Sequence, residues 1–212
     1  MISIMAIMMV AVLPAFNGIK GAGDVTRVAF DVAGTLEQAR SYAMANNTYV
    51  FVGFTERNGT DATQAGVGQI LMVAMGSMDG TRNFVRQDDP SKSNLIPLTK
   101  LRRIENMHIE DSLPNSGTMS RPPVDDACRV GNDAFLAQNS FTVPGNSSGG
   151  TFTKIIQFDP RGTASIQSGT VSIPHWMEIG LVAARGSAVV SKTNCAALVL
   201  DGVTGSAKIY RP

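Results

Sequence analysis

The stretch "LEQARSYAMANNTYVFVGF" (residues 36–54) joins the end of a helix to the start of a strand. In and before it, apolar residues step by three or four and so form one stripe along a helix: Val25, Val28, Val32, Leu36, Ala39 and Ala43. The helix is expected to end at Asn46-Asn47, because asparagine tolerates the left-handed and turn conformations that stop a helix. The β-branched and aromatic residues of "YVFVGF" (49–54) then favour a strand.

The chain opens with "MISIMAIMMVAVLPAF" (1–16), which carries no charged side chain. A secretory signal would have a basic residue before its apolar run, but the first basic residue here is Lys20. As a helix, Ile2 to Phe16 would rise roughly 22 Å, which is short of a hydrocarbon core of about 30 Å. We therefore expect it to be the second half of a longer apolar helix that starts before Met1. The glycine-rich residues 17–23 predict a loosened turn after it.

The remaining sequence predicts a head built from strands. Apolar runs favour strands at "QILMVAMG" (69–76), "WMEIGLVAARG" (176–186) and "CAALVLDGVTGSAKIYRP" (195–212). "FTKIIQFDPRGTASI" (152–166) predicts a hairpin that turns at Asp159-Pro160-Arg161-Gly162. Because Pro97 cannot donate to a sheet, residues 94–113 predict an edge strand with an approach loop. Residues 114–133, rich in Pro, Ser, Gly and Asp, predict a surface loop.

Together these patterns predict an α+β protein in two parts. Residues 1–24 form an apolar N-terminal helix that crosses a membrane or lies in a filament core. Residues 25–212 form a globular domain, in which an amphipathic helix (25–46) packs on a head of antiparallel sheets (49–212).

Three motifs carry a resemblance to a known family. The helix end resembles the minor pseudopilins of the H type and their fimbrial T relatives at Leu36, Ala39, Arg40, Ser41, Ala43 and Asn46. The turn Phe158-x-Pro160-x-Gly162 is similar to one in the head of those proteins. The opening run resembles the second half of the N-terminal segment of type IV pilins, with Pro14 at the position of their helix-kinking proline. Within this family the chain also resembles the cassette pilins known as Verru_Chthon cassette protein D.

The resemblance implies a structural subunit of a type II secretion or type IV pilus-like filament. It implies that about eight mature residues and a basic leader precede Met1, and that a prepilin peptidase processes and methylates the N-terminus. The expected partners are other pilin or pseudopilin subunits and the inner membrane, which the chain crosses once with its head in the periplasm or on an extracellular filament. The residues expected to carry assembly are Ile2, Ile4, Ile7, Val10, Leu13, Pro14 and Phe16. Val25, Val28, Leu36 and Ala39 are expected to seat the helix on the head.

A second hypothesis remains open at this point. The chain is then an exported β-sandwich binding module that its N-terminus holds to the membrane and that never polymerises. The two hypotheses differ in whether the opening run contacts sibling subunits.

No motif in the sequence predicts an enzyme or a cofactor site, since nucleophile-elbow, phosphate-binding and dinucleotide-binding patterns are absent. The net charge of +1 gives no broad attraction for nucleic acid, and "KLRR" (100–103) lacks the interleaved aromatic residues of a single-strand binder. No nucleic-acid partner is therefore expected.

Cysteines, histidines and paired carboxylates leave a few sites open. Cys128 and Cys195 form either a disulfide or two buried, unpaired thiols. With two cysteines and two isolated histidines, a structural metal site is not expected. The acidic pairs are interpreted as solvated surface charge rather than calcium ligands: Asp88-Asp89, Glu110-Asp111 and Asp125-Asp126.

Overall fold

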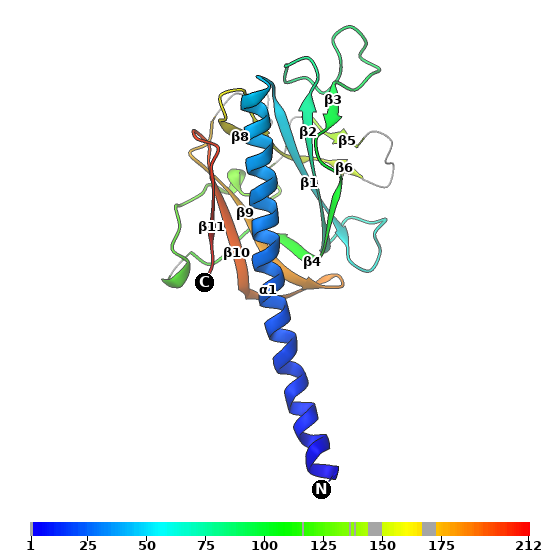
Figure 1. Cartoon of the computed structure of the whole chain (residues 1–212), viewed down its shortest axis with the longest axis vertical. Coiled ribbons are helices and arrows are strands. Elements are labelled where there is room, and N and C mark those ends of the chain that lie inside the picture. The colour runs from blue at the N-terminus through cyan, green and yellow to red at the C-terminus, as the bar shows by residue number, and fades with distance from the viewer. Residues whose placement is uncertain (1, 116, 136, 138, 144–149, 167–172) are drawn as a thin grey trace.

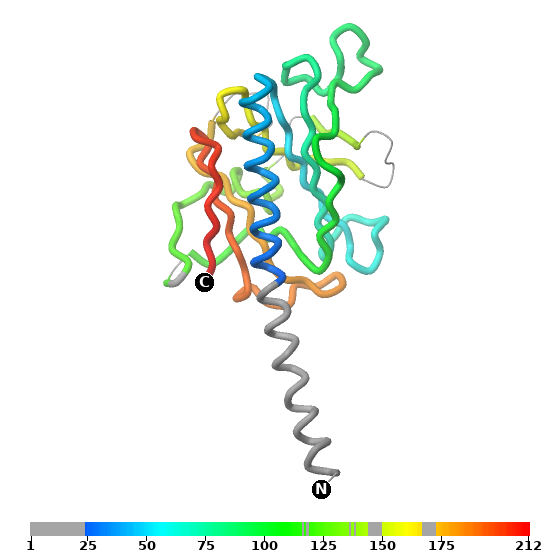
Figure 2. The backbone as a smooth tube through the Cα atoms, viewed as in Figure 1, coloured from blue at the N-terminus to red at the C-terminus, as the bar shows by residue number. Residues whose placement is uncertain are grey.

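The computed structural model describes residues 2–115, 117–135, 137, 139–143, 150–166 and 173–212, and for residues 2–23 and 118 it describes the backbone alone. Within this part of the chain, one long helix is followed by strands and two short 3₁₀ turns (Figure 1 and Figure 2). Helix α1 spans Ile2–Ala45. The other elements are β1 (Val50–Asn58), β2 (Gly68–Ser77), β3 (Leu95–Pro97), β4 (Arg102–Glu110), η1 (Gly117–Met119), η2 (Asp126–Cys128), β5 (Phe141–Thr142), β6 (Thr151–Phe152), β7 (Lys154–Phe158), β8 (Ala164–Ile166), β9 (Trp176–Arg185), β10 (Ala188–Asp201) and β11 (Ala207–Tyr210). The α+β class is confirmed.

The end of α1 follows the sequence prediction. The N–H of Asn46 donates to the carbonyl of Tyr42 at 3.0 Å, and that of Thr48 to Ala43 at 3.1 Å. Between them Asn47 takes a φ of 48°, the left-handed conformation that stops a helix. β1 begins three residues later, so the helix end and the first strand are both confirmed.

The expected loosened turn at residues 17–23 is absent. α1 is helical from end to end through this glycine-rich stretch. Each glycine costs about 1 kcal/mol relative to alanine, which weakens a helix without breaking it.

Nine of the described strands form one antiparallel sheet. The order is β11-β10-β9-β4-β2-β1-β7-β8, and β3 pairs with β2 beside β4. The prediction of an edge strand at 94–113 is correct only for β3, where Pro97 lies opposite Met75. β4 is interior instead, because Arg102 to Met107 pair with β2 and Met107 to Glu110 pair with β9. The remaining two described strands, β5 and β6, pair with each other in a separate two-stranded sheet.

The sheet curves around the helix. In Figure 1 α1 lies across it, with β9 to β11 on one side and β1 and β2 on the other. At the end of α1 the two sheet ends meet, since the N–H of Ala164 donates to the carbonyl of Gly202 at 2.8 Å. The predicted hairpin supplies one of these ends, and the N–H of Gly162 donates to Asp159 at 2.9 Å in its turn. The helix therefore fills the hollow of an almost closed sheet.

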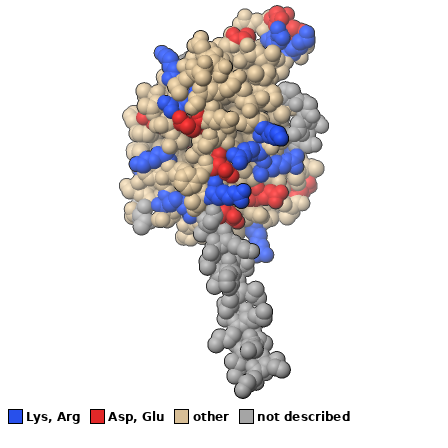
Figure 3. Space-filling model, viewed as in Figure 1, with Lys and Arg blue, Asp and Glu red and all other residues tan. Residues whose placement is uncertain are grey.

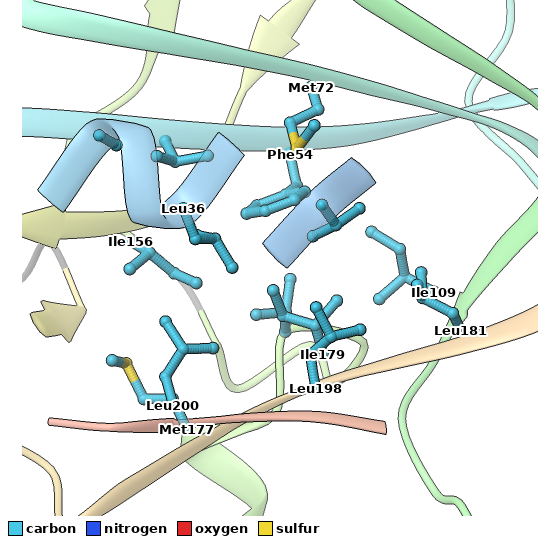
Figure 4. Packing of buried hydrophobic residues seen from close by; sticks show 14 of the residues in the cluster. Leu36, Phe54, Met72, Ile109, Ile156, Met177, Ile179, Leu181, Leu198 and Leu200 are labelled. Carbon is cyan, nitrogen blue, oxygen red and sulfur yellow. The ribbon is translucent and has the colours of Figure 1, made fainter. Parts of the chain in front are cut away.

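The main core lies between the helix and the concave face of the sheet. Leu36 of α1 is fully buried among residues from several strands, including Phe54, Ile156 and Leu200 (Figure 4). Because side chains alternate along a strand, every strand crossing the hollow gives half of its residues to this cluster. This explains why apolar residues from β1, β2, β4, β7, β9 and β10 converge on one helix.

The convex face of the sheet is covered too. Over β1 and β2, a chain of aromatic contacts runs from Phe51 through Phe84 and Phe141 to Phe152, with ring centroids 4.9, 5.6 and 5.2 Å apart. Over β9 and β10, the loop after β4 places Leu113 and Met119 against Val182 and Cys195. Burial on both faces explains why β2 is apolar along nearly its whole length.

Candidate functional site

The inner face of α1 seats the helix on the sheet. Every residue of one stripe is at most 1% exposed: Val25, Ala29, Val32, Leu36, Ala39 and Ala43. Val28, which the sequence also placed on the seat, is only partly buried and packs at the margin of the same cluster. The seating residues predicted from spacing are therefore confirmed, with Ala29 added and Val28 moved to the edge.

The predicted assembly residues lie outside the described side chains. The backbone of residues 2–16 belongs to α1. The positions concerned are Ile2, Ile4, Ile7, Val10, Leu13, Pro14 and Phe16. Their role stays a prediction.

The outer face of the described part of α1 points away from the sheet. It carries Arg27, Phe30, Gly34, Glu37 and Ser41, which share one helix face opposite the stripe. Phe30 is 64% exposed, and a Cβ built on Gly34 would meet no atom within 4 Å. This face thus presents an aromatic side chain beside an open position.

One residue of the basic cluster at 100–103 contacts the helix. Arg102 lies beside α1, with its Nη2 3.6 Å from Asp31 Oδ1 and its Nη1 3.4 Å from the hydroxyl of Thr35. Over the face drawn in Figure 3, cationic and anionic side chains are interspersed. Arg102 therefore helps to hold the helix, a use that its sequence context did not indicate.

A titratable pair bridges two strands that are not neighbours. Glu56 Oε1 on β1 lies 2.9 Å from His108 Nδ1 on β4 and also accepts the N–H of Ile109 at 2.9 Å. Strand β2, which separates β1 from β4, begins at Gly68 and leaves this N–H without a strand partner. Burial disfavours the charged imidazole, but the hydrogen bond and charge of Glu56 outweigh it and raise the pKa of His108. The sequence showed His108 as isolated because Glu56 is 52 residues away.

A cavity of about 270 Å³ lies next to this pair. Its walls are mainly apolar, with Phe54, Val67 and Ile109 among them, and Glu56 and Lys154 add one charge of each sign. The ammonium of Lys154 donates to the carbonyl of Gly131 at 2.9 Å, and burial lowers the pKa of this amine. The cavity therefore has one acidic and one basic side chain in an otherwise mainly apolar wall.

Both cysteines are free thiols in the structure. Cys195 is buried in β10, and its Sγ lies 3.6 Å from the Sδ of Met119. Burial raises the pKa of Cys195 and of Cys128. The sequence left open a disulfide or two unpaired thiols, and in the structure the thiols are unpaired. Cys195 packs as a small apolar residue.

An ion pair that the sequence did not indicate is buried under the loop after β4. Arg121 binds Glu178 of β9 through two hydrogen bonds, Nε to Oε2 at 2.7 Å and Nη2 to Oε1 at 3.0 Å. Both side chains are 2% exposed. Arg121 also donates to the carbonyls of Leu113, at 3.0 Å, and Pro114, so it anchors the loop to the sheet.

The acidic pairs are engaged by basic side chains of the same chain. Asp88 binds Arg86 at 3.0 and 3.1 Å, and Asp126 lies 2.7 Å from Arg129. The expectation of solvated charge is wrong for Glu110, whose side chain is only 7% exposed. Its Oε2 lies 3.0 Å from Nζ of Lys192. The end of β4 is covered there by the loop that follows it.

Two further features concern the described residues alone. No three His, Cys, Asp or Glu side chains among them come together as a metal site would require. No helix in the same part of the chain combines the length and the apolarity needed to cross a membrane.

Comparisons of the chain with protein-family models, with curated proteins and with solved structures found no match.

Proposed function

We propose that this chain is a minor pilin- or pseudopilin-like subunit of a type II secretion or type IV pilus-like filament. Its N-terminal segment is held first in the inner membrane and then among the helices of sibling subunits, while the head lies outside the membrane. The subunit acts by assembly and not by catalysis. The proposal rests on two lengths of one helix whose sequences require different surroundings.

The observation that carries the proposal is the seat of α1. Residues 25–43 use one apolar face, and the sheet buries that face completely. The same helix continues to Ile2 through a segment with no charged residue between Ile2 and Phe16. An uncharged helix that is apolar around its whole circumference needs an apolar environment, either lipid or other helices. In a filament, packing between such helices replaces contacts with lipid.

The local motifs support the same proposal. The helix end with Arg40 and Ser41, the following strand and the Phe158-Pro160-Gly162 hairpin occur here in the order in which H-type pseudopilins have them. The head supplies loops of varied composition around a rigid sheet, which suits a subunit that recognises neighbours by shape.

The proposal is tested with the full-length gene in its native cells. A membrane-permeable cross-linker should yield a ladder of multimers containing this chain, and the protein should remain in the inner-membrane fraction after an alkaline wash. Val10→Asp places a charge in the uncharged segment and should abolish the ladder, whereas Val10→Leu should preserve it. Mass spectrometry of the isolated protein should find a processed, methylated N-terminus.

The second hypothesis makes the opposite prediction for the same experiment. A membrane-anchored binding module would be retained in the membrane but would give no ladder with either variant. That result, with an unmethylated N-terminus, would reject the filament proposal.

A further inference from the structure

Two cavities adjoin at the end of the head where α1 stops (Figure 1). The larger, of about 370 Å³, lies between the last turn of α1 and the start of the loop that joins β2 to β3. The smaller, of about 280 Å³, lies within that loop. Met78 and Asp79 line both cavities, so the two are neighbours. Cavities that bind small molecules measure about 300–1,000 Å³, and the larger one is within that range.

Asp79 stands between the two cavities and is held rigidly. Its Oδ1 accepts hydrogen bonds from Ser77 Oγ at 3.0 Å, Thr81 N at 2.8 Å, Thr81 Oγ1 at 2.7 Å and Asn94 Nδ2 at 2.6 Å. Desolvation alone would raise the pKa of this carboxyl, but the hydrogen bonds outweigh it and lower the pKa to about 2. Its Oδ2 has no partner among the described residues. Asp79 is therefore an exposed, ionised and fixed carboxylate with one acceptor oxygen to spare.

Asn94 shows that the loop is built to hold Asp79. Besides Asp79 Oδ1, its Nδ2 donates to the carbonyl of Asn83 at 2.9 Å, so the amide cannot be turned over without setting oxygen against oxygen. Its own Oδ1 is then buried without a partner among the described residues. A buried acceptor that lacks a donor destabilises a fold and calls for an explanation. The fixed position of Asp79 supplies that explanation.

Uncharged polar groups and apolar surface complete the larger cavity. Tyr42 and Asn47 line it, and neither the hydroxyl of Tyr42 nor the side-chain amide of Asn47 has a hydrogen-bond partner in the part of the chain that the structure describes. Met78 and Ile96 add apolar surface, since they are 55% and 37% exposed. The cavity thus offers hydrogen-bond donors, acceptors, an aromatic ring and apolar contacts together.

The charges around the cavities disfavour a charged ligand. Asp79 and Asp88 repel an anion, and Arg86 in the smaller cavity repels a cation. Asp88 is not free to balance a cation, because Arg86 already binds it at 3.0 and 3.1 Å. An ammonium group also only donates, so it would leave the amide N–H groups unpaired. A sugar hydroxyl both donates and accepts, and it therefore pairs with carboxylates and amides alike.

We propose that Asp79 and the cavities on either side of it bind a neutral oligosaccharide. One sugar ring lies beside Tyr42 and Asn47, with a hydroxyl donating to Asp79 Oδ2, and the next ring lies beside Arg86 and Gln87. The C–H faces of the first ring pack on the exposed apolar side chains of the larger cavity. This inference goes beyond the proposed function and does not depend on it, because the head carries the site whether or not the chain polymerises.

Isothermal titration calorimetry of the full chain tests the proposal, in a detergent that has no sugar head group. The probes are neutral maltotriose, cellotriose, mannotriose and chitotriose, with spermidine and glucose 6-phosphate as charged comparisons. At least one neutral trisaccharide should bind with a Kd of about 1 mM or lower. The corresponding monosaccharide should bind about tenfold more weakly, because it fills one cavity only. If no neutral trisaccharide binds, or if only a charged probe does, the inference is wrong.

Substitutions locate the bound sugar. Asp79→Asn keeps Oδ1 for its four donors but turns the spare acceptor into a donor, and it should weaken binding about tenfold. Asp61→Asn is the matched control, because Asp61 Oδ1 accepts the N–H and hydroxyl of Thr63 at 3.0 and 2.6 Å in the loop between β1 and β2, away from both cavities. This control should bind as the unchanged chain does.

Asn47→Gly keeps the test decisive if Asp79→Asn loosens the loop. Glycine accepts the φ of 48° at this position, so the substitution removes the amide and leaves the hydrogen bonds of Asp79 in place. It should weaken binding about fivefold. None of the three variants should change the cross-linked ladder, so sugar binding and assembly are separate readouts. If Asp79→Asn and Asn47→Gly both bind as tightly as Asp61→Asn, the sugar binds elsewhere and the inference is wrong.

Discussion

The buried pair of Arg121 and Glu178 gives the sharpest prediction of stability. Arg121→Met keeps most of the side-chain volume but removes the guanidinium that binds Glu178 through two hydrogen bonds. The carboxylate of Glu178 is then left 2% exposed and without a counter-ion. The carbonyls of Leu113 and Pro114 lose the same donor. The variant therefore leaves three acceptor groups under the loop after β4 without a hydrogen-bond donor.

The magnitude follows from the burial. Breaking a fully buried ion pair by removing one partner costs about 3–5 kcal/mol, since the remaining charge keeps its desolvation penalty. The two carbonyls each add a share of about 1 kcal/mol, part of which water recovers where the loop opens. We expect Arg121→Met to lower the free energy of unfolding by about 4 kcal/mol. Replacing both partners, as in Arg121→Met with Glu178→Leu, should restore most of this loss because no charge remains buried.

The assay is urea unfolding of the full chain in detergent, followed by the fluorescence of Trp176. This is the only tryptophan, and it lies in β9 two residues before Glu178. Arg129→Met is the matched control, because Arg129 pairs with Asp126 in the same loop and the carboxylate side of that pair is 75% exposed. Such a surface pair contributes less than about 1 kcal/mol. The reasoning is refuted if Arg121→Met costs no more than this control, or if the double variant is as unstable as the single one.

Three further predictions concern the helix seat, the sheet closure and the titratable pair. Leu36→Ala should lower the free energy of unfolding by about 2–5 kcal/mol because Leu36 is fully buried, whereas Gln38→Ala should lower it by less than about 0.5 kcal/mol. Equal effects of the two substitutions in urea unfolding would contradict the role of Leu36 in seating the helix. Gly205→Ala should cost more than about 1 kcal/mol, because its φ of 67° strains a side chain and the added Cβ would clash with the carbonyl oxygen of Gly162. A neutral thermal melt would show that this turn moves freely. The pKa of His108 in the folded chain lies above its ordinary 6.5. The link to Glu56 therefore stabilises the fold fully below pH 6.5, and this stabilisation is lost as the pH rises through the folded pKa. Glu56→Gln should flatten this decline above pH 6.5, and an unchanged pH profile of the melting temperature would rule the link out.

Local patterns in the sequence were enough to predict the helix, its end and the first strand. The stripe through Leu36 needs only the helical period, and Asn47 needs only the tolerance of asparagine for a left-handed φ. The hairpin at Asp159 to Gly162 was predictable for the same reason, because its turn is specified by four consecutive residues. Each of these features depends on residues that are close in the chain.

Features that depend on strand order were not predictable. The interior place of β4 depends on pairing with β9, which lies about 70 residues later in the chain. Glu56 meets His108, and Arg121 meets Glu178, only because the sheet brings β1 to β4 and the loop after β4 to β9. Charged residues look solvated in a sequence unless the partner is known, and here the partner is 52 or 57 residues away.

The two faces of α1 offer a way to separate folding from assembly. Leu36 and its stripe are held by the sheet, so a substitution there should lower assembly only through the fraction of folded subunits. Phe30 is 64% exposed and a Cβ on Gly34 would meet no atom within 4 Å, so substitutions there should leave the seat intact and change assembly without destabilising the subunit. When the ladder intensity is plotted against the free energy of unfolding, inner-face variants should fall on one curve and outer-face variants below it. Gly34→Leu should lie furthest from the curve, because it moves stability up and assembly down. If all variants share one curve, the outer face makes no contact of its own, and the exposure of Phe30 has no role in assembly.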